Sequence, residues 1–145
     1  MPVIKELEGV DFPYVQKEPM NPEIKKLWVD ALRSGEYKQG QGTLKRSDCF
    51  CCLGVLTDIF IKITGRAEWI PVAESHRARI ISTDYAYQEE SSAILLKAVC
   101  EWAGLKRPNP VMPIRLPTRN ITTLSELNDL GRGFSEIADI IEKYL

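Results

Sequence analysis

The stretch Cys52-Leu-Gly-Val-Leu-Thr-Asp-Ile-Phe-Ile-Lys-Ile-Thr-Gly65 is apolar on most sides when it is drawn as a helix. Such a helix is stable only where neighbouring elements cover most of its surface. We therefore expect residues 52–65 to form the central buried helix. Glycine inside a helix costs about 1 kcal/mol relative to alanine. The presence of Gly54 therefore predicts a neighbour whose backbone passes very close to it.

Four more helices are expected around this one. Asn21 can cap a helix that begins at Pro22 and ends at Ser34-Gly35. Its apolar residues recur at helical spacing and predict one buried stripe, made of Ile24, Leu27, Trp28, Ala31 and Leu32. The other predicted helices cover residues 93–103, with Ser91 or Ser92 as the cap, residues 122–129, and residues 136–144.

Short strands are expected between these helices. Residues 43–45 and 49–51 read as strand pieces around a Lys-Arg-Ser-Asp turn, and residues 67–73 and 78–82 read as strands or extended segments. Four prolines make residues 105–121 an extended connection. The sequence thus predicts an α+β protein with one small domain over residues 1–145. It would have about five helices around a small irregular antiparallel sheet, with residues 1–20 as an extended N-terminal arm and residues 21–145 as the body.

Composition excludes several classes of protein. The chain has 145 residues, of which 44% are hydrophobic and 27% charged, as in ordinary globular proteins. A net charge of −1 argues against a general nucleic-acid coat or a polybasic membrane binder. The N-terminus has no signal-peptide pattern, and no apolar run approaches the roughly 20 residues that span a bilayer. We expect a cytoplasmic protein whose four cysteines are thiols.

Charge is distributed unevenly along the chain. Residues 1–30 carry −2, residues 31–119 carry +4, and residues 120–145 carry −3. One interpretation is a set of solvated faces that balance one another. The other is an anion-binding face made by the middle segment.

Five sequence motifs together resemble a family of small phage and prophage proteins. They are Trp28-x-x-Ala31-Leu32-Arg33-Ser34-Gly35-x-Tyr37-x-Gln39-Gly40, Cys51-Cys52-Leu53-Gly54-Val55-Leu56-x-Asp58, Glu101-Trp102-Ala103-Gly104-Leu105, Leu127-Asn128-Asp129 and Phe134-x-x-Ile137-Ala138-x-x-Ile141-Glu142. The resemblance covers most of residues 21–145. It implies a phage or prophage setting, with action inside the bacterial host, and no particular activity.

The best candidate for ligand binding is the segment Tyr37-Lys-Gln39-Gly40-Gln41-Gly42. Glycines let backbone N–H groups approach a ligand, glutamine offers donors and acceptors, and a tyrosine ring can stack on a base. The segment matches neither phosphate-loop pattern, so it is not a P-loop. The simpler interpretation is a turn with polar side chains.

Other candidate ligand contacts are arginines and a polar pair. Arg46, Arg115 and Arg119 lie in loops or at strand ends, and arginine suits phosphate recognition. Asn128 and Asp129 could bind a polar ligand edge, although helix capping and turn formation are the simpler roles.

Cysteine chemistry gives two further hypotheses. A zinc site would draw on Cys49, Cys51, Cys100 and His76, but no C-x-x-C pair exists, and buried thiols explain these residues better. We expect no metal and no cofactor. Cys52 begins a helix, where the macrodipole lowers a thiol pKa, and the single histidine, His76, is its only available imidazole base.

These observations favour a non-catalytic phage accessory or anti-defence protein that binds a small anionic ligand, such as a nucleotide immune signal. One alternative is an inhibitor that binds a host defence protein through a surface patch. The other is a hydrolase that uses Cys52 and His76. Residues 134–142 resemble the first helix of a helix-turn-helix, but no recognition helix follows, so sequence-specific DNA binding is not expected. The sequence does not determine the oligomeric state, and a homo-oligomer is compatible with it.

Overall fold

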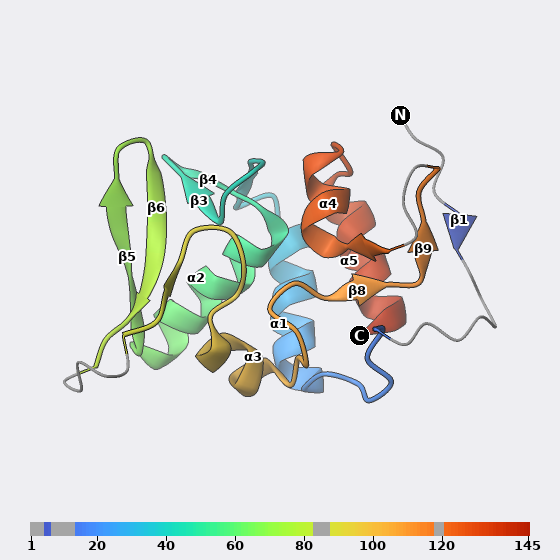
Figure 1. The fold of residues 1–145 in the computed structure, drawn as a ribbon, viewed down its shortest axis with the longest axis horizontal. Coiled ribbons are helices and arrows are strands. Elements are labelled where there is room, and N and C mark those ends of the chain that lie inside the picture. Colours follow the sequence, from blue (N-terminus) through green and yellow to red (C-terminus); the bar gives the residue numbers. More distant parts are fainter. Residues whose placement is uncertain (1–4, 7–13, 83–87, 118–120) are drawn as a thin grey trace.

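Helix α2 (Cys52–Thr64) lies at the centre of the computed structural model, which describes residues 5–6, 14–82, 88–117 and 121–145 (Figure 1). The described residues form four other helices, α1 (Pro22–Arg33), α3 (Lys97–Ala103), α4 (Leu124–Asp129) and α5 (Phe134–Tyr144). Every residue of α2 from 52 to 60 is buried, and α1, α3 and α4 all contact this helix. The prediction of a central buried helix is confirmed.

The main sheet covers the other side of α2. Its strands are β2 (Lys38–Gln39), β3 (Lys45–Arg46), β4 (Cys49–Phe50), β5 (Ala67–Val72), β6 (Ser75–Ile80) and β7 (Glu90–Ser91). The order is β2-β4-β3-β6-β5, and β7 also pairs with β6. All these pairs are antiparallel except β2 with β4, which is parallel. The α+β class is confirmed, with a mixed sheet in which antiparallel pairs dominate.

Two short ladders lie on the other side of the helices. Strand β8 (Val111–Met112) pairs with β10 (Thr122–Thr123), and β9 (Ile114–Arg115) pairs with β1 (Lys5–Glu6). On this side the Met20 backbone N–H also donates to the Leu145 carbonyl at 2.8 Å. Residues 1–4 and 7–13 of the predicted arm lie outside the described residues.

The close backbone approach predicted at Gly54 is present. A Cβ atom built on Gly54 would overlap the backbone carbonyl oxygen of Leu44, which ends the loop before β3. That same carbonyl accepts from the Cys51 N–H at 3.2 Å. Glycine therefore lets the sheet segment lie directly on the first turn of α2, and this contact positions β3 and β4.

Helix α1 begins as predicted, but its buried face differs from the predicted stripe. Asn21 Oδ1 accepts from the backbone N–H groups of Glu23 and Ile24 at 2.9 and 3.3 Å. Leu27 is 42% exposed, whereas Val29 is buried. Helix α1 packs against both α2 and α5. Its buried face is therefore not the single stripe that the sequence predicts.

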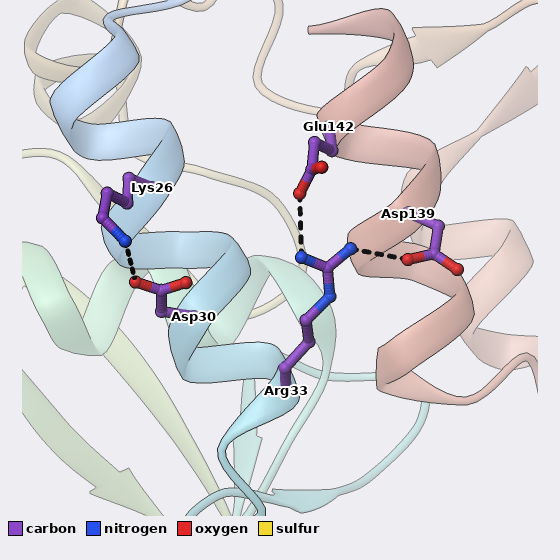
Figure 2. Close-up of polar contacts among 5 residues, drawn as sticks. All are labelled: Lys26, Asp30, Arg33, Asp139 and Glu142. Atoms are coloured by element: carbon purple, nitrogen blue, oxygen red, sulfur yellow. Dashed lines mark hydrogen bonds and ion pairs between the residues drawn. The ribbon is translucent and has the colours of Figure 1, made fainter.

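Ion pairs on the surface join α1 to α5. The Arg33 guanidinium donates to Asp139 at 2.6 Å and to Glu142 at 2.8 Å, while Lys26 and Asp30 pair within α1 (Figure 2). Exposed ion pairs stabilise a fold by less than about 1 kcal/mol each. The attachment of α1 to α5 therefore depends mainly on their buried side chains.

Several predicted boundaries are wrong. The strand expected at residues 43–45 is β3 at Lys45–Arg46, and α5 begins at Phe134 rather than at residue 136. Helix α3 begins at Lys97 rather than at residue 93, because the Leu95 N–H bonds to the Pro108 carbonyl at 2.9 Å in place of a helical partner. Ser91 accepts from the N–H groups of Ala93 and Ile94 and closes a turn instead of capping the helix. Residues 75–77 belong to strand β6 and not to a connection, because the turn from β5 is made at residues 73 and 74.

None of the helices in the described ranges is long and apolar enough to cross a membrane.

The substitution Gly54→Ala should lower the free energy of unfolding by more than about 2 kcal/mol, because the new Cβ must displace a backbone oxygen and overpacked sites cost roughly that much. Urea unfolding followed by circular dichroism measures the change. The matched control is Gly133→Ala, where a Cβ meets open space and the cost should stay below about 1 kcal/mol. Equal costs at the two positions would contradict the close approach.

Candidate functional site

The structure brings together the two polar segments that the sequence singled out. Residues 39–42 and the end of α4 lie against each other, and the fully buried Asn128 amide joins them. Asn128 Oδ1 accepts from the Cys52 backbone N–H at 3.1 Å and from Gln39 Nε2 at 3.0 Å. Its Nδ2 donates to the Gly40 carbonyl at 2.7 Å. Asn128 thus bonds at once to β2, to the loop after it and to the first turn of α2.

Most remaining donors in this region also have internal partners. Gln39 Nε2 donates to the Arg132 carbonyl at 2.6 Å, and the Gly42 N–H donates to Asp129 Oδ1 at 2.9 Å. Gln41 Nε2 makes a longer contact, 3.5 Å, with the Asn128 carbonyl. The groups proposed to hold a ligand therefore hold each other, and the Asp129 carboxylate adds a negative charge that disfavours an anion here.

The predicted arginines do not converge on this region. Arg46 lies on β3 and pairs with Glu74 at 3.7 Å. Arg115 lies on β9, on the far side of the helices from the main sheet (Figure 1). Arg119 lies outside the described residues.

Burial keeps Cys52 from serving as a reactive thiol. Its side chain is fully buried, and that burial raises the pKa well above the ordinary value for a thiol. Its Sγ donates to the Leu124 carbonyl at 3.7 Å. The helix macrodipole, which favours a thiolate, does not overcome this loss of solvation. The geometry gives the hydrolase hypothesis no accessible nucleophile at this position.

Two of the other three cysteines show the same tendency, whereas Cys49 is half-buried. Cys51 and Cys100 are buried, and burial raises the pKa of both thiols, that of Cys100 to about 11. Among the described residues, no group of three or more histidine, cysteine, aspartate or glutamate side chains is placed to hold a metal ion.

A second cluster gathers where α2 meets the main sheet. Four rings form a chain of edge-to-face contacts, with centroids 5.1 Å apart for Tyr37 and Phe50, 6.2 Å for Phe50 and Trp69, and 6.5 Å for Trp69 and His76. We call this cluster the aromatic rim. It comprises these four residues together with the charged residues Lys45, Asp58 and Lys62. Apart from Phe50 and Asp58, its side chains are half-buried or exposed.

Asp58 fixes one side of the aromatic rim. It accepts from the Tyr37 hydroxyl at 2.6 Å and the Trp69 indole N–H at 3.0 Å, and it pairs with Lys62 at 2.9 Å. Burial by itself raises the pKa of Asp58, but the hydrogen bonds outweigh burial and lower it. Burial, followed by the bond to Asp58, raises the pKa of Tyr37 to about 12. Both rings are therefore held in place by an ionised carboxylate.

Lys45 lies on the other side of the aromatic rim without an acidic partner. Its Nζ lies 5.3 Å from the Phe50 ring centre and 5.5 Å from the Trp69 ring centre, within cation–π range. Among the described residues, no carboxylate lies within 4.0 Å of this ammonium. Residues Lys45 and His76 are directly paired across β3 and β6. Burial, and then the charge of Lys45, lowers the pKa of His76, and its buried Nδ1 has no hydrogen-bond partner.

Sequence reasoning found only part of the aromatic rim. It named Tyr37 and His76 for other roles, and it missed Lys45, Phe50, Asp58, Lys62 and Trp69 as site residues. A usable signal was the i, i+4 spacing of Asp58 and Lys62, which places a carboxylate beside an ammonium on one face of a helix otherwise too apolar to carry charge.

Comparison with known proteins gives one family match. The family model described as a domain of unknown function (DUF8296) matches residues 20–145. No curated protein and no solved structure matches the chain.

The substitution Asn128→Ala should lower the free energy of unfolding by about 2–4 kcal/mol, because it leaves the Cys52 N–H and the Gly40 carbonyl buried without partners. Chemical denaturation measures the loss. Asn109→Ala is the matched control, because Asn109 is half-buried and its side chain bonds to Ser125 alone among the described residues, so its loss should cost about 1 kcal/mol. An Asn128 variant no less stable than the Asn109 variant would contradict the role assigned to this amide.

Asp58 should make stability depend on pH at the acidic end. Its pKa is lower in the folded chain than in the unfolded one, so its contribution is fully present above about pH 4 and is lost as the pH falls through the folded value. Unfolding free energies measured across this range should fall less steeply in Asp58→Asn than in the parent. The exposed control Asp30→Asn should keep the parent slope. If the unfolding free energy of both variants fell with pH as steeply as that of the parent, Asp58 would not be the source of the acid sensitivity.

Proposed function

We propose that this chain, which belongs to the family described as a domain of unknown function (DUF8296), binds a small anionic ligand with a planar aromatic part at its aromatic rim and does not transform it chemically. A nucleotide is the ligand class that fits this description. The observation that carries the proposal is the ammonium of the half-buried residue Lys45, which lies beside two aromatic rings and has no carboxylate within 4.0 Å among the described residues.

The charge balance of the aromatic rim supports an anion. Lys62 is neutralised by Asp58, whereas the charge of Lys45 is not neutralised by any described side chain. A partly desolvated charge without a partner costs free energy in the empty protein. An anionic group placed against Lys45 would remove that cost, and the His76 imidazole lies beside Lys45 on the paired strand.

The aromatic part of the ligand is supported by the rings. Trp69 and His76 are half-buried, and Asp58 holds the indole of Trp69 through its N–H. A ring that is already fixed loses little entropy when a base stacks on it, and stacking on an aromatic side chain contributes about 1–3 kcal/mol per base.

The same geometry favours binding without chemistry. The cysteine thiol considered as a nucleophile is fully buried and protonated. In the phage or prophage setting implied by the sequence resemblance, a protein of this kind would act in the host cytoplasm by withdrawing a nucleotide immune signal.

Isothermal calorimetry with a panel of cyclic nucleotides, ADP-ribose and inorganic phosphate tests the proposal. At least one nucleotide should bind, and Lys45→Met should weaken that binding by about 10- to 100-fold, because it removes one charge-assisted contact while keeping the aliphatic stem on the rings. The matched control is Lys38→Met, which removes an exposed, already paired lysine and should change the affinity less than about twofold.

The single histidine gives a second readout of the same binding event. An anion beside His76 stabilises the imidazolium, so the bound ligand should raise the His76 pKa, and the affinity should increase as the pH falls through it. Nuclear magnetic resonance measures this pKa directly, because the chain has a single histidine and its ring signals need no residue assignment. Absence of heat with every member of the panel, or equal affinity in Lys45→Met, would contradict the proposal. Recovery of a stoichiometric host protein would favour the alternative of a protein inhibitor.

A further inference from the structure

A pocket of about 360 Å³ lies away from the aromatic rim and shares no lining residue with it. Its walls come from Arg66 after α2, Ile80 at the end of β6, Gln88 and Glu89 before β7, and three residues of α3, which are Lys97, Ala98 and Glu101. This volume is in the range of sites that hold small molecules. The lining combines two cations, two carboxylates and apolar side chains.

Arg66 is the cation that lacks a partner. Its guanidinium carbon lies 5.4 Å from the ring centre of the buried Phe60, which packs edge to face on Trp102 with centroids 5.3 Å apart. Within the described part of the chain, no carboxylate lies within 4.0 Å of this guanidinium. The aromatic ring therefore orients the guanidinium, whose donors match both oxygens of a carboxylate.

The two carboxylates differ in their availability. Glu89 accepts from the Lys97 backbone N–H at 2.7 Å, so it is engaged with the start of α3. Glu101 makes only a long contact of 4.0 Å with Lys97 Nζ, and both of these side chains are more than 60% exposed. Such a pair contributes little free energy. Glu101 can therefore give up this contact to accept from a ligand.

The described lining is electrically neutral, which distinguishes this pocket from the aromatic rim. The charges of Arg66 and Lys97 balance those of Glu89 and Glu101. A multiply charged anion would be attracted by the Arg66 guanidinium but repelled by the Glu101 carboxylate. A ligand that carries one charge of each sign gains from both. Ile80 and Ala98 add an apolar surface on which a short aliphatic chain can be buried.

We propose that this pocket binds a free α-amino acid with an aliphatic side chain, as the zwitterion. Arg66 binds the carboxylate, Glu101 accepts from the ammonium, and the side chain lies on Ile80 and Ala98. The assignment is independent of ligand binding at the aromatic rim.

Titration of the ¹⁵N-labelled full chain with L-leucine tests this assignment. The amide resonances of Ile80, Ala98 and Glu101 should shift with a saturable dependence, at a dissociation constant of about 1 mM or below. N-acetyl-L-leucine lacks the ammonium, and L-leucine methyl ester lacks the carboxylate, so each should bind at least about tenfold more weakly. These ligand comparisons need no variant and do not depend on folding.

Variants then test the two charged contacts. Arg66→Met and Glu101→Gln should each weaken L-leucine binding by about tenfold or more. Arg115→Met on β9 is the matched control for loss of an exposed arginine, and Lys45→Met separates this pocket from the aromatic rim; both should leave the affinity unchanged. Absence of saturable shifts, binding of the acetylated ligand as tight as that of L-leucine, or full affinity in Arg66→Met would overturn the proposal.

Discussion

The buried amide of Asn128 is the interaction on which the arrangement of this protein depends. Its oxygen caps the first turn of α2 through the Cys52 N–H, and its nitrogen fixes the loop after β2 through the Gly40 carbonyl. A buried polar group is tolerated only when its hydrogen bonds are made, so one side chain constrains three segments at once. The approach of the Leu44 carbonyl to Gly54 then places β3 and β4 on the same helix turn.

This constraint separates the residues that hold the fold from those available to a ligand. The polar side chains around residues 39–42 satisfy one another and leave little for a partner. Among the described residues, charged or titratable groups without an acidic partner or hydrogen bond include Lys45 and His76 Nδ1 in the aromatic rim and Arg66 in the pocket beside α3, while the hydroxyl oxygens of Thr43 and Thr122 are buried without partners as well. Function is therefore better sought where the network of hydrogen bonds is incomplete than where polar residues are most dense.

The two proposed sites are distinguished by charge and by shape. The aromatic rim combines rings, two of them held by Asp58, with the Lys45 charge, which no carboxylate of the described residues neutralises; this combination suits a planar anion. The pocket beside α3 is open to solvent, and its described lining is electrically neutral and partly apolar, which suits a small zwitterion. Each ligand assignment follows from the charge that has no partner at its site. A charged group near an apolar surface gains most free energy from a ligand that brings the opposite charge.

The sequence by itself determined the features that depend on near neighbours in the chain. These are the buried helix after Cys52, the Asn21 cap, the strand that includes residues 49 and 50, and the close approach at Gly54. It did not determine the start of α3, which a bond to Pro108 delays, or the buried position of Val29, which requires α5. Nor could it assemble the aromatic rim, whose members come from Tyr37 to His76 and meet only through strand pairing and the packing of α2. Only the tertiary structure decided that Asn128 serves the fold and Lys45 stays without a partner, because hydrogen bonds and ion pairs form between groups that are close in space, whatever their separation along the chain.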